Sequence, residues 1–280
     1  FRMKYLQIIF FLIFSSNFIF SMSGSWNSNS ASILENKKWE VGLFQPFRYG
    51  YSETMEYSVH PIGFFVMPNI SFKKKEKDWT NFKAASSLSL RYPTPLLNML
   101  SRKGIGGLLD PNLDLPPMLG ISYSWIMSKS LKHFDITITN GLDFGLVSGT
   151  LKKSATIDLP LVFHRLSVFN NGWGYHGGID IQKPLLKNFS VLIDLDLLLL
   201  PNLDKAQSNP SFEKMRGNYS LEHKFLLSWS KSQKFRVTTG YKLVHAEFPF
   251  GKQTRLLPYL PLIEKWIPIV ELQWSGIKKG

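Results

Sequence analysis

The sequence predicts an all-β protein, a transmembrane antiparallel up-and-down β-barrel of about 12 strands, within a range of about 10 to 14. Three observations lead to this fold class. Apolar and polar residues alternate along most of the chain, and several alternating stretches are longer than an ordinary strand. No interior stretch has enough consecutive apolar residues to form a spanning helix.

The clearest alternating stretch is residues 134–146, FDITITNGLDFGL. Its even-numbered positions are apolar apart from Asn140, whereas its odd-numbered positions include Asp135 and Asp143. A soluble strand has about five or six residues, but a transmembrane strand needs about nine to eleven. Asn140-Gly141 also fits a hairpin turn, but such a turn would place apolar residues of one arm on the face of polar residues of the other. We therefore expect one continuous strand.

Composition and charge narrow the class further. The chain has 280 residues, of which 44% are hydrophobic, so general disorder is excluded. Charged residues make up 19%, less than the usual quarter, which suits a lipid-facing belt or a secreted β-protein. The absence of cysteine excludes disulfides, cysteine-based metal sites and lipid attachment at an N-terminal cysteine. The net charge of +13 suggests nucleic acid or a phosphate-rich membrane surface as a neighbour, or else a lysine-rich proteome.

The first 23 residues predict a secretory signal peptide. Basic residues flank Met3, an apolar run follows, and Ser21 and Ser23 provide small residues before Gly24. An uncleaved membrane anchor is the alternative. Residues 24–37 are rich in serine and asparagine and predict a flexible lead-in. A secreted protein is not expected to meet nucleic acid, so we expect no nucleic-acid partner.

We expect the barrel to cover residues 38–275, with a short tail at 276–280. Residues 93–117 are rich in proline and glycine and predict an irregular insert within the barrel. The remaining barrel residues contain the alternating stretches, which are 39–48, 55–60, 70–75, 82–92, 121–130, 134–146, 156–164, 173–182, 191–199, 219–229, 235–243 and 270–274.

With a signal peptide, repeated two-faced strands and a last strand that ends near an aromatic residue, the chain resembles Gram-negative outer-membrane β-barrel proteins. The resemblance is one of architecture and covers residues 38–275. It implies a place in the bacterial outer membrane, in contact with outer-membrane lipid and lipopolysaccharide. It also implies that the barrel-assembly machinery reads the strand ending at Trp274, although Ser275–Gly280 follow.

In such barrels both termini lie in the periplasm, and long loops lie outside the cell. On the predicted strand count, the long loops 201–218 and 248–265 fall outside. The count places four other connections in the periplasm, namely 149–153, 184–187, 231–233 and, as an exception to the rule, the insert 93–117.

The polar faces of the strands predict a lumen in which acidic residues outnumber basic ones. The main lumen candidates are Asp135, Asp143, Asp180, Asp194, Asp196, Glu222, Lys224, Arg236, Lys242 and His176. One interpretation is a narrow pore that favours cations. The other is a set of cross-strand ion pairs that fills and rigidifies the barrel.

A run of lysines lies at a turn that the count places outside the cell. Lys73, Lys74, Lys75 and Lys77 are therefore candidates for neutralising lipopolysaccharide phosphates. A solvated loop is the alternative.

The sequence shows no recognisable catalytic motif. None of the six histidines has a serine two residues later, which is the spacing used by barrel lipid hydrolases. His176 and Asp180 share one strand face and fit either an acid–base pair or lumen packing. No phosphate-binding glycine motif or HExxH zinc motif occurs, so we expect no metal and no cofactor.

These observations favour an integral outer-membrane β-barrel that acts as a passive narrow channel or as a structural component of the envelope. Two alternatives stay open. The first is a barrel enzyme that acts on outer-membrane lipid or surface peptides. The second is a soluble secreted β-protein whose aromatic residues form an internal core.

Overall fold

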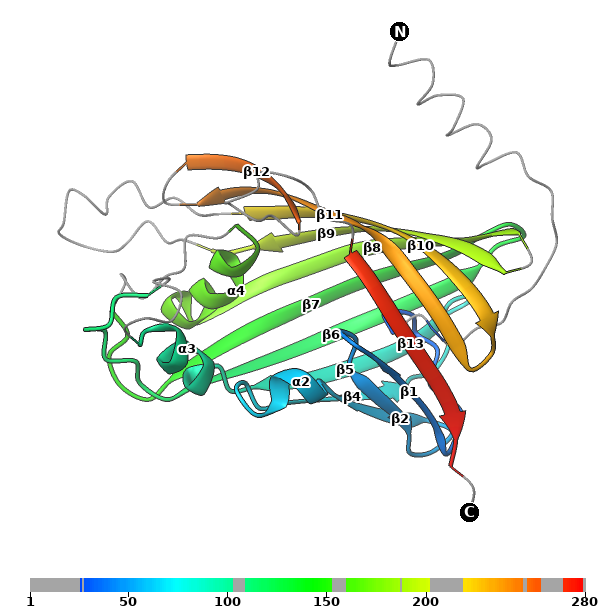
Figure 1. Ribbon diagram of the computed structural model, residues 1–280, viewed down its shortest axis with the longest axis horizontal. Coiled ribbons are helices and arrows are strands. Elements are labelled where there is room, and N and C mark those ends of the chain that lie inside the picture. Colours follow the sequence, from blue (N-terminus) through cyan, green and yellow to red (C-terminus); the bar gives the residue numbers. More distant parts are fainter. Residues whose placement is uncertain are drawn as a thin grey trace, which may run out of the picture.

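The computed structural model describes residues 26, 28–102, 109–152, 160–186, 188–201, 219–248, 251–257 and 269–278. Within these residues the chain forms a closed antiparallel up-and-down β-barrel of 12 strands with few helices (Figure 1), which confirms the predicted fold class. The expected signal peptide, residues 1–23, lies outside the described residues.

The strands differ in length around the barrel. The long strands are β5 (Lys83–Arg91), β6 (Met118–Ser130), β7 (Asp135–Val147), β8 (Trp173–Leu186), β9 (Phe189–Leu199), β10 (Tyr219–Ser232) and β11 (Phe235–Phe248). The short strands are β1 (Lys38–Gly42), β2 (Phe47–Gly50), β3 (Met55–Val59) and β4 (Asn69–Lys75). The wall is consequently lower on the side of β1 to β3 (Figure 1).

The last strand of the barrel consists of two pieces, β12 (Gly251–Leu257) and β13 (Ile269–Ile277). Both run antiparallel to β11, because β12 pairs with residues 242–248 and β13 pairs with residues 235–240. β13 also pairs with β1, which closes the barrel. Among the described residues, β12 has no strand partner other than β11. Its second edge therefore faces the side where the wall is low.

β1 begins and β13 finishes at the same end of the barrel, which we call the terminal end. Strand alternation places the turns near 184–187 and 231–233 at this end. The insert 93–117 and residues 149–153 belong to connections at the opposite end, so grouping them with the termini was wrong. The stretch 39–48 contains two strands and a turn instead of the one predicted strand. The extra strand reverses the direction of the strands that follow it, so the connections at 93–117 and 149–153 lie at the opposite end from the one predicted.

The predicted strand at 156–164 is a second departure. Residues 153–159 lie outside the described part of the chain, and residues 160–171 form helix α4 (Pro160–Asn171). Pro160 suits the first turn of a helix, where its missing N–H costs nothing. The two departures compensate, because one extra strand near residue 45 balances the one lost near residue 160, and the total of 12 is correct.

Three helices accompany the barrel in its described part. α2 (Pro61–Phe64) follows β3, and α3 (Thr94–Leu100) lies in the insert after β5. α4 contacts β7, β8, β10 and β11, and it packs Phe163 against the inward-facing Val244 and Ala246. α4 therefore occupies the lumen at the end opposite the terminal end. No helix among the described residues is long and apolar enough to cross a membrane.

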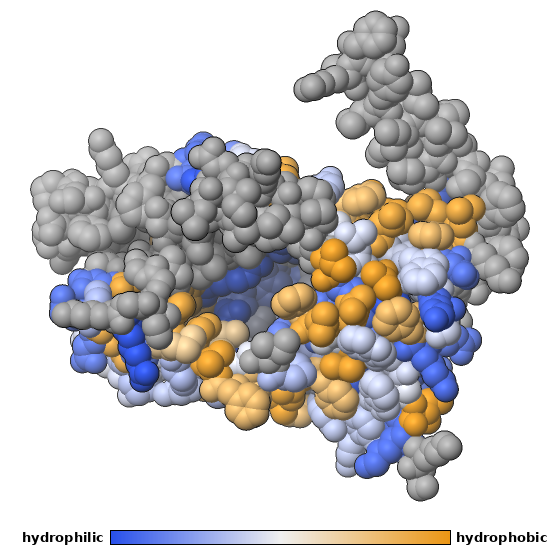
Figure 2. Space-filling view, in the orientation of Figure 1, coloured by the Kyte–Doolittle hydropathy of each residue, from blue (hydrophilic) through white to orange (hydrophobic). Residues whose placement is uncertain are grey.

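The two faces of the wall have the opposite polarity to those of a soluble protein. Buried lumen-facing residues include Glu40, Arg48, Asp180, Asp194, Glu222 and Arg236. Exposed residues on the outer face include Trp125, Leu142, Phe144, Ile179, Leu195 and Trp229. Figure 2 shows apolar residues grouped on the outer surface over β13 and its neighbours. The alternation of the sequence thus separates a polar interior from an apolar exterior.

The stretch at 134–146 forms one strand, β7, as predicted. Asn140 and Gly141 pair with β6 and β8 in the middle of the sheet instead of turning. Asn140 lies on the outer face, where its side-chain oxygen accepts a hydrogen bond of 2.7 Å from the hydroxyl of Tyr175. This bond provides the polar partner that an amide needs on an otherwise apolar face.

Residues 28–34, which we call the N-terminal segment, lie inside the barrel, although the sequence predicts a flexible lead-in there; residues 35–37, which lead to β1, are exposed. The side chains of Ala31 and Leu34 are only 3% and 1% exposed. The Ala31 N–H donates to Ser128 Oγ at 2.8 Å, and the Leu34 N–H donates to a Glu56 carboxylate oxygen at 2.7 Å. Inward-facing polar groups of the wall therefore satisfy the backbone of this segment.

Candidate functional site in the barrel lumen

The first group of lumen residues lies on the low wall. Arg48 on β2 forms ion pairs of 2.8 Å with Glu40 on β1 and with Glu56 on β3. Lys73 on β4 approaches Glu56 at 3.4 Å. All four side chains are nearly buried, so the charges of two acids and two bases balance one another. This group joins the four consecutive strands β1 to β4 from the inside.

Lys73 is a correction to the predicted lipopolysaccharide-facing set. Its ammonium group donates to the backbone carbonyls of Ser28, Ser30 and Ser32 at 2.9, 2.8 and 3.3 Å, and so it holds the N-terminal segment in the lumen.

Lys73 faces inward because it lies one position from Lys74 on a strand, where successive side chains point to opposite faces. Lys74 and Lys75 are exposed, as is Lys77 in the following turn. That turn lies at the terminal end and not at the end predicted to face outward.

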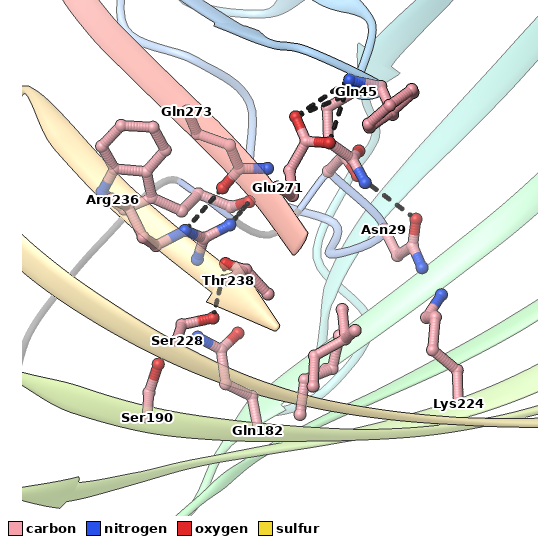
Figure 3. Close-up of a pocket in the computed structure, with 15 residues that line it drawn as sticks. Asn29, Gln45, Gln182, Ser190, Lys224, Ser228, Arg236, Thr238, Glu271 and Gln273 are labelled. Carbon is pink, nitrogen blue, oxygen red and sulfur yellow. Dashed lines mark hydrogen bonds between the residues drawn. The ribbon is translucent and has the colours of Figure 1, made fainter. Parts of the chain in front are cut away.

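A second group surrounds a cavity of about 190 Å³ between the N-terminal segment and the wall (Figure 3). Arg236 on β11 donates to Gln273 on β13 at 2.6 Å and stacks over the ring of Trp26 at 5.1 Å. Glu271 on β13 accepts the backbone N–H groups of Phe44 and Gln45 at 2.9 and 3.3 Å. The turn between β1 and β2 is therefore bound to β13.

The third group connects α4 to the wall. Glu222 on β10 is fully buried and accepts two hydrogen bonds from Arg165 of α4, at 2.5 and 3.0 Å. It also forms an ion pair with Lys242 on β11. Burial alone would lower the pKa of Arg165, but the hydrogen bonds and the negative charge of Glu222 raise it overall. Arg165 is thus a permanent cation that fixes the helix in the lumen.

The fourth group is acidic and lies on β8, β9 and β10. Lys224 forms an ion pair with Asp194. Asp180 lies opposite Asp194 in the sheet register, and Asp196 lies two residues further along β9. Groups of three or more histidine, cysteine, aspartate or glutamate side chains that could hold a metal ion do not occur among the described residues.

The fifth group contains a serine, a histidine and an aspartate from three adjacent strands. Ser124 Oγ on β6 is 2.9 Å from His176 Nε2 on β8. His176 Nδ1 is 2.9 Å from Asp143 Oδ2 on β7. Arg91 on β5 lies 3.9 Å from the other Asp143 oxygen. Ser124 and His176 both oppose Gly141 in the sheet register, so the imidazole reaches across β7.

Gly141 makes this arrangement possible. A Cβ atom at that position would lie 2.3 Å from His176 Nε2 and 2.4 Å from the adjacent ring carbon. Any side chain there would displace the imidazole from Ser124. Residue 141 is therefore a glycine because the imidazole occupies the space above the strand, and not because of its backbone conformation.

The structure places nine of the ten predicted lumen residues within these groups; Asp135 is exposed at the end of β7 near the terminal end. Three cations that the sequence pattern did not assign to the lumen, Arg48, Lys73 and Arg165, contribute to the ion pairs. The lumen is therefore less acidic than predicted. Arg48 lies on a second strand within the stretch 39–48, which the sequence predicts as one strand. Lys73 lies on the predicted strand 70–75, but the sequence analysis grouped it with the lysines of the following turn. Arg165 belongs to a helix whose first residues were predicted as a strand.

The partners of His176 in the structure differ from Asp180, the partner considered in the sequence analysis. Its Nδ1 atom pairs with Asp143 instead of Asp180, and its Nε2 atom pairs with Ser124. These partners are 33 and 52 residues away in the sequence. The sequence indicated only that Ser124 and Asp143 lie on the polar faces of their strands, and it did not indicate that they meet His176.

The fold and its interior define the protein as a closed antiparallel β-barrel with a polar, ion-paired lumen. A search of protein-family models found no match to the chain, and a search of curated proteins found none either.

Proposed function

We propose that the protein is an integral β-barrel of the bacterial outer membrane whose lumen is closed by its own N-terminal segment. The observation that carries the proposal is the reversed polarity of the wall. Asp194 and Glu222 are at most 1% exposed inside, whereas Trp125, Leu142 and Phe144 are 37–40% exposed outside. A large apolar outer belt is unfavourable in water and favourable in lipid.

The contacts of the N-terminal segment support a closed lumen over an open channel. The segment is bonded to β3, β4 and β6 through Glu56, Lys73 and Ser128. α4 lies in the lumen toward the opposite end and is fixed through Glu222. A passive channel would require one or both of these elements to move. In its closed form the barrel acts as a structural component of the envelope.

The same proposal includes the partners that the architecture implies. Outer-membrane lipid would cover the apolar belt, and the barrel-assembly machinery would read β13, where Trp274 is 37% exposed on the outer face. The terminal end would face the periplasm, as in other outer-membrane barrels. Lipopolysaccharide would then meet the opposite end, and Lys74, Lys75 and Lys77 would face the periplasm.

Two measurements test the proposal. The protein should require detergent for extraction from cell envelopes and should migrate differently on gels before and after heating. In planar bilayers the full-length protein should show no conductance steps, whereas deletion of residues 28–36 should produce them. Extraction without detergent would refute the membrane location, and steady conductance of the full-length protein would refute the closed lumen.

A further inference from the structure

The Ser124–His176–Asp143 group has the hydrogen-bond order that activates a serine nucleophile. A hydroxyl bonded to imidazole Nε2 can transfer its proton to that nitrogen, and a carboxylate bonded to Nδ1 orients the ring and stabilises its charged form. Both distances are 2.9 Å, within the range for such contacts. The serine and histidine are part-buried, so both face the lumen with access to it.

The supporting residue is less accessible than the base, as activation requires. The side chain of Asp143 is 11% exposed and that of His176 is 21% exposed. The three residues are held on three adjacent long strands whose register is regular over this region. Sites built on paired strands keep their geometry better than sites on loops.

We propose that Ser124 and His176 are the catalytic nucleophile and base of a hydrolase for carboxylic esters with an apolar acyl chain, with Asp143 as the positioning residue. Ser124 Oγ forms a bond to the ester carbonyl carbon, and its proton moves to His176 Nε2. The bond to the leaving oxygen breaks, and that oxygen takes the proton from Nε2. Water then attacks the acyl-serine and gives a proton to Nε2, the acyl–Oγ bond breaks, and Ser124 regains the proton as the free acid leaves.

The negative charge that develops on the ester oxygen needs a stabilising donor. Backbone N–H groups in paired strands are engaged in the sheet, so this role falls to side chains. Arg91 lies on the same wall beside Asp143, and its side chain is 30% exposed. It is a cation that a bound substrate can reach from the lumen.

The low wall supplies an entry for an apolar acyl chain. β1 ends and β2 begins at the turn 43–46, and the second edge of β12 has no strand partner among the described residues. Figure 2 shows a hollow on this side, with hydrophilic residues in its depth. Among the described residues, this hollow leads from the side of the barrel toward the polar inner wall.

The rim of this opening is apolar. Phe44 and Phe65 are 64% and 89% exposed, and Leu43 and Phe64 are also exposed. His60 Nε2 lies 2.8 Å from the carbonyl oxygen of Phe44, which joins the turn 43–46 to α2. In a barrel that is embedded in a membrane, these side chains would contact acyl chains. The proposal that the ester comes from a membrane lipid thus rests on the proposed function. The proposal that Ser124 is a nucleophile does not depend on it.

A fluorophosphonate probe tests the nucleophile on the full chain in detergent micelles. Ser124 should displace fluoride and become labelled, as identified by mass spectrometry of its peptide. Ser124→Ala and His176→Gln should abolish labelling, and Asp143→Asn should slow it on the order of 10⁴-fold, the size of effect that loss of the orienting carboxylate has in serine proteases. Ser87→Ala is the matched control, because Ser87 pairs with Ser124 in the register and also faces inward. It should be labelled like the unchanged protein.

Heat-dependent gel mobility of each variant shows whether its barrel is folded. Absence of labelling in the folded unchanged protein, or equal labelling of Ser124→Ala, would overturn the proposal. The two sources of ester are then separated with p-nitrophenyl butyrate in solution and with phosphatidylethanolamine–phosphatidylglycerol vesicles that contain the inserted protein. Release of fatty acid from the vesicles, lost in Ser124→Ala, supports entry from the membrane. Hydrolysis of the soluble ester alone supports the nucleophile and refutes the membrane route.

Discussion

Replacement of Lys73 by methionine tests whether the N-terminal segment is an integral part of the barrel. The Lys73 ammonium group is the hydrogen-bond donor to three backbone carbonyls of that segment, those of Ser28, Ser30 and Ser32. A carbonyl left without a partner in a buried place costs about 1 kcal/mol or more. Three such losses give about 3 kcal/mol. Glu56 keeps its contact with Arg48 at 2.8 Å, so no large additional cost from an unpaired carboxylate is expected.

Lys74→Met is the matched control, because Lys74 is the next residue on the same strand and points outward. Its side chain is 59% exposed, and it lies 3.7 Å from Glu76. An exposed ion pair of this kind contributes little, so we expect a change of about 0.5 kcal/mol or less.

The assay is reversible urea unfolding of the refolded barrel in detergent, followed by tryptophan fluorescence. Limited proteolysis would report separately on the N-terminal segment, which Lys73→Met should release and Lys74→Met should not. Equal free energies of unfolding for the two variants, with the segment protected in both, would refute the role assigned to Lys73.

Two further substitutions test other parts of the lumen. Gly141→Ala would place a methyl carbon 2.3 Å from His176 Nε2 and 2.5 Å from the backbone oxygen of Tyr123, so the imidazole and the local strand pairing must both shift. Labelling of Ser124 by the fluorophosphonate should fall on the order of 100-fold, and heat-dependent gel mobility shows that the barrel of this variant is still folded. Full labelling of this variant would contradict the proposed geometry. Glu222→Gln leaves Arg165 and Lys242 without their buried anion, so it should lower the free energy of unfolding by about 3 kcal/mol. Hydrogen exchange should show faster opening of α4 in that variant, and unchanged exchange would argue against Glu222 as the anchor of the helix.

Much of the fold could be predicted from local sequence, because a strand pattern repeats every two residues and needs no knowledge of the neighbouring strand. Residues 134–146 show this well, since alternation outweighed the turn tendency of Asn140-Gly141. Prediction failed at 39–48, where alternation continues through a turn, and at 160–164, where a few alternating residues belong to a helix. Short stretches of this kind fit both periods.

The candidate site was predictable only in part. Alternation assigned Asp143, Asp180, Asp194 and Glu222 to the polar face. It could not show that Ser124 meets His176, since the two residues come from strands separated by a third one. It also assigned residues 28–37 to no structure, because their polar composition favours a flexible chain unless other groups bind its backbone.

The sequence by itself determined that this chain forms an antiparallel barrel with a polar inner face and an apolar outer face, because those properties depend on the order of residues along each strand. The tertiary structure alone decided which lumen groups meet. Strand register, closure through β13 and the positions of α4 and the N-terminal segment bring together residues that are distant in sequence. The ion pairs that close the lumen and the proposed nucleophile in its wall both arise from these long-range contacts.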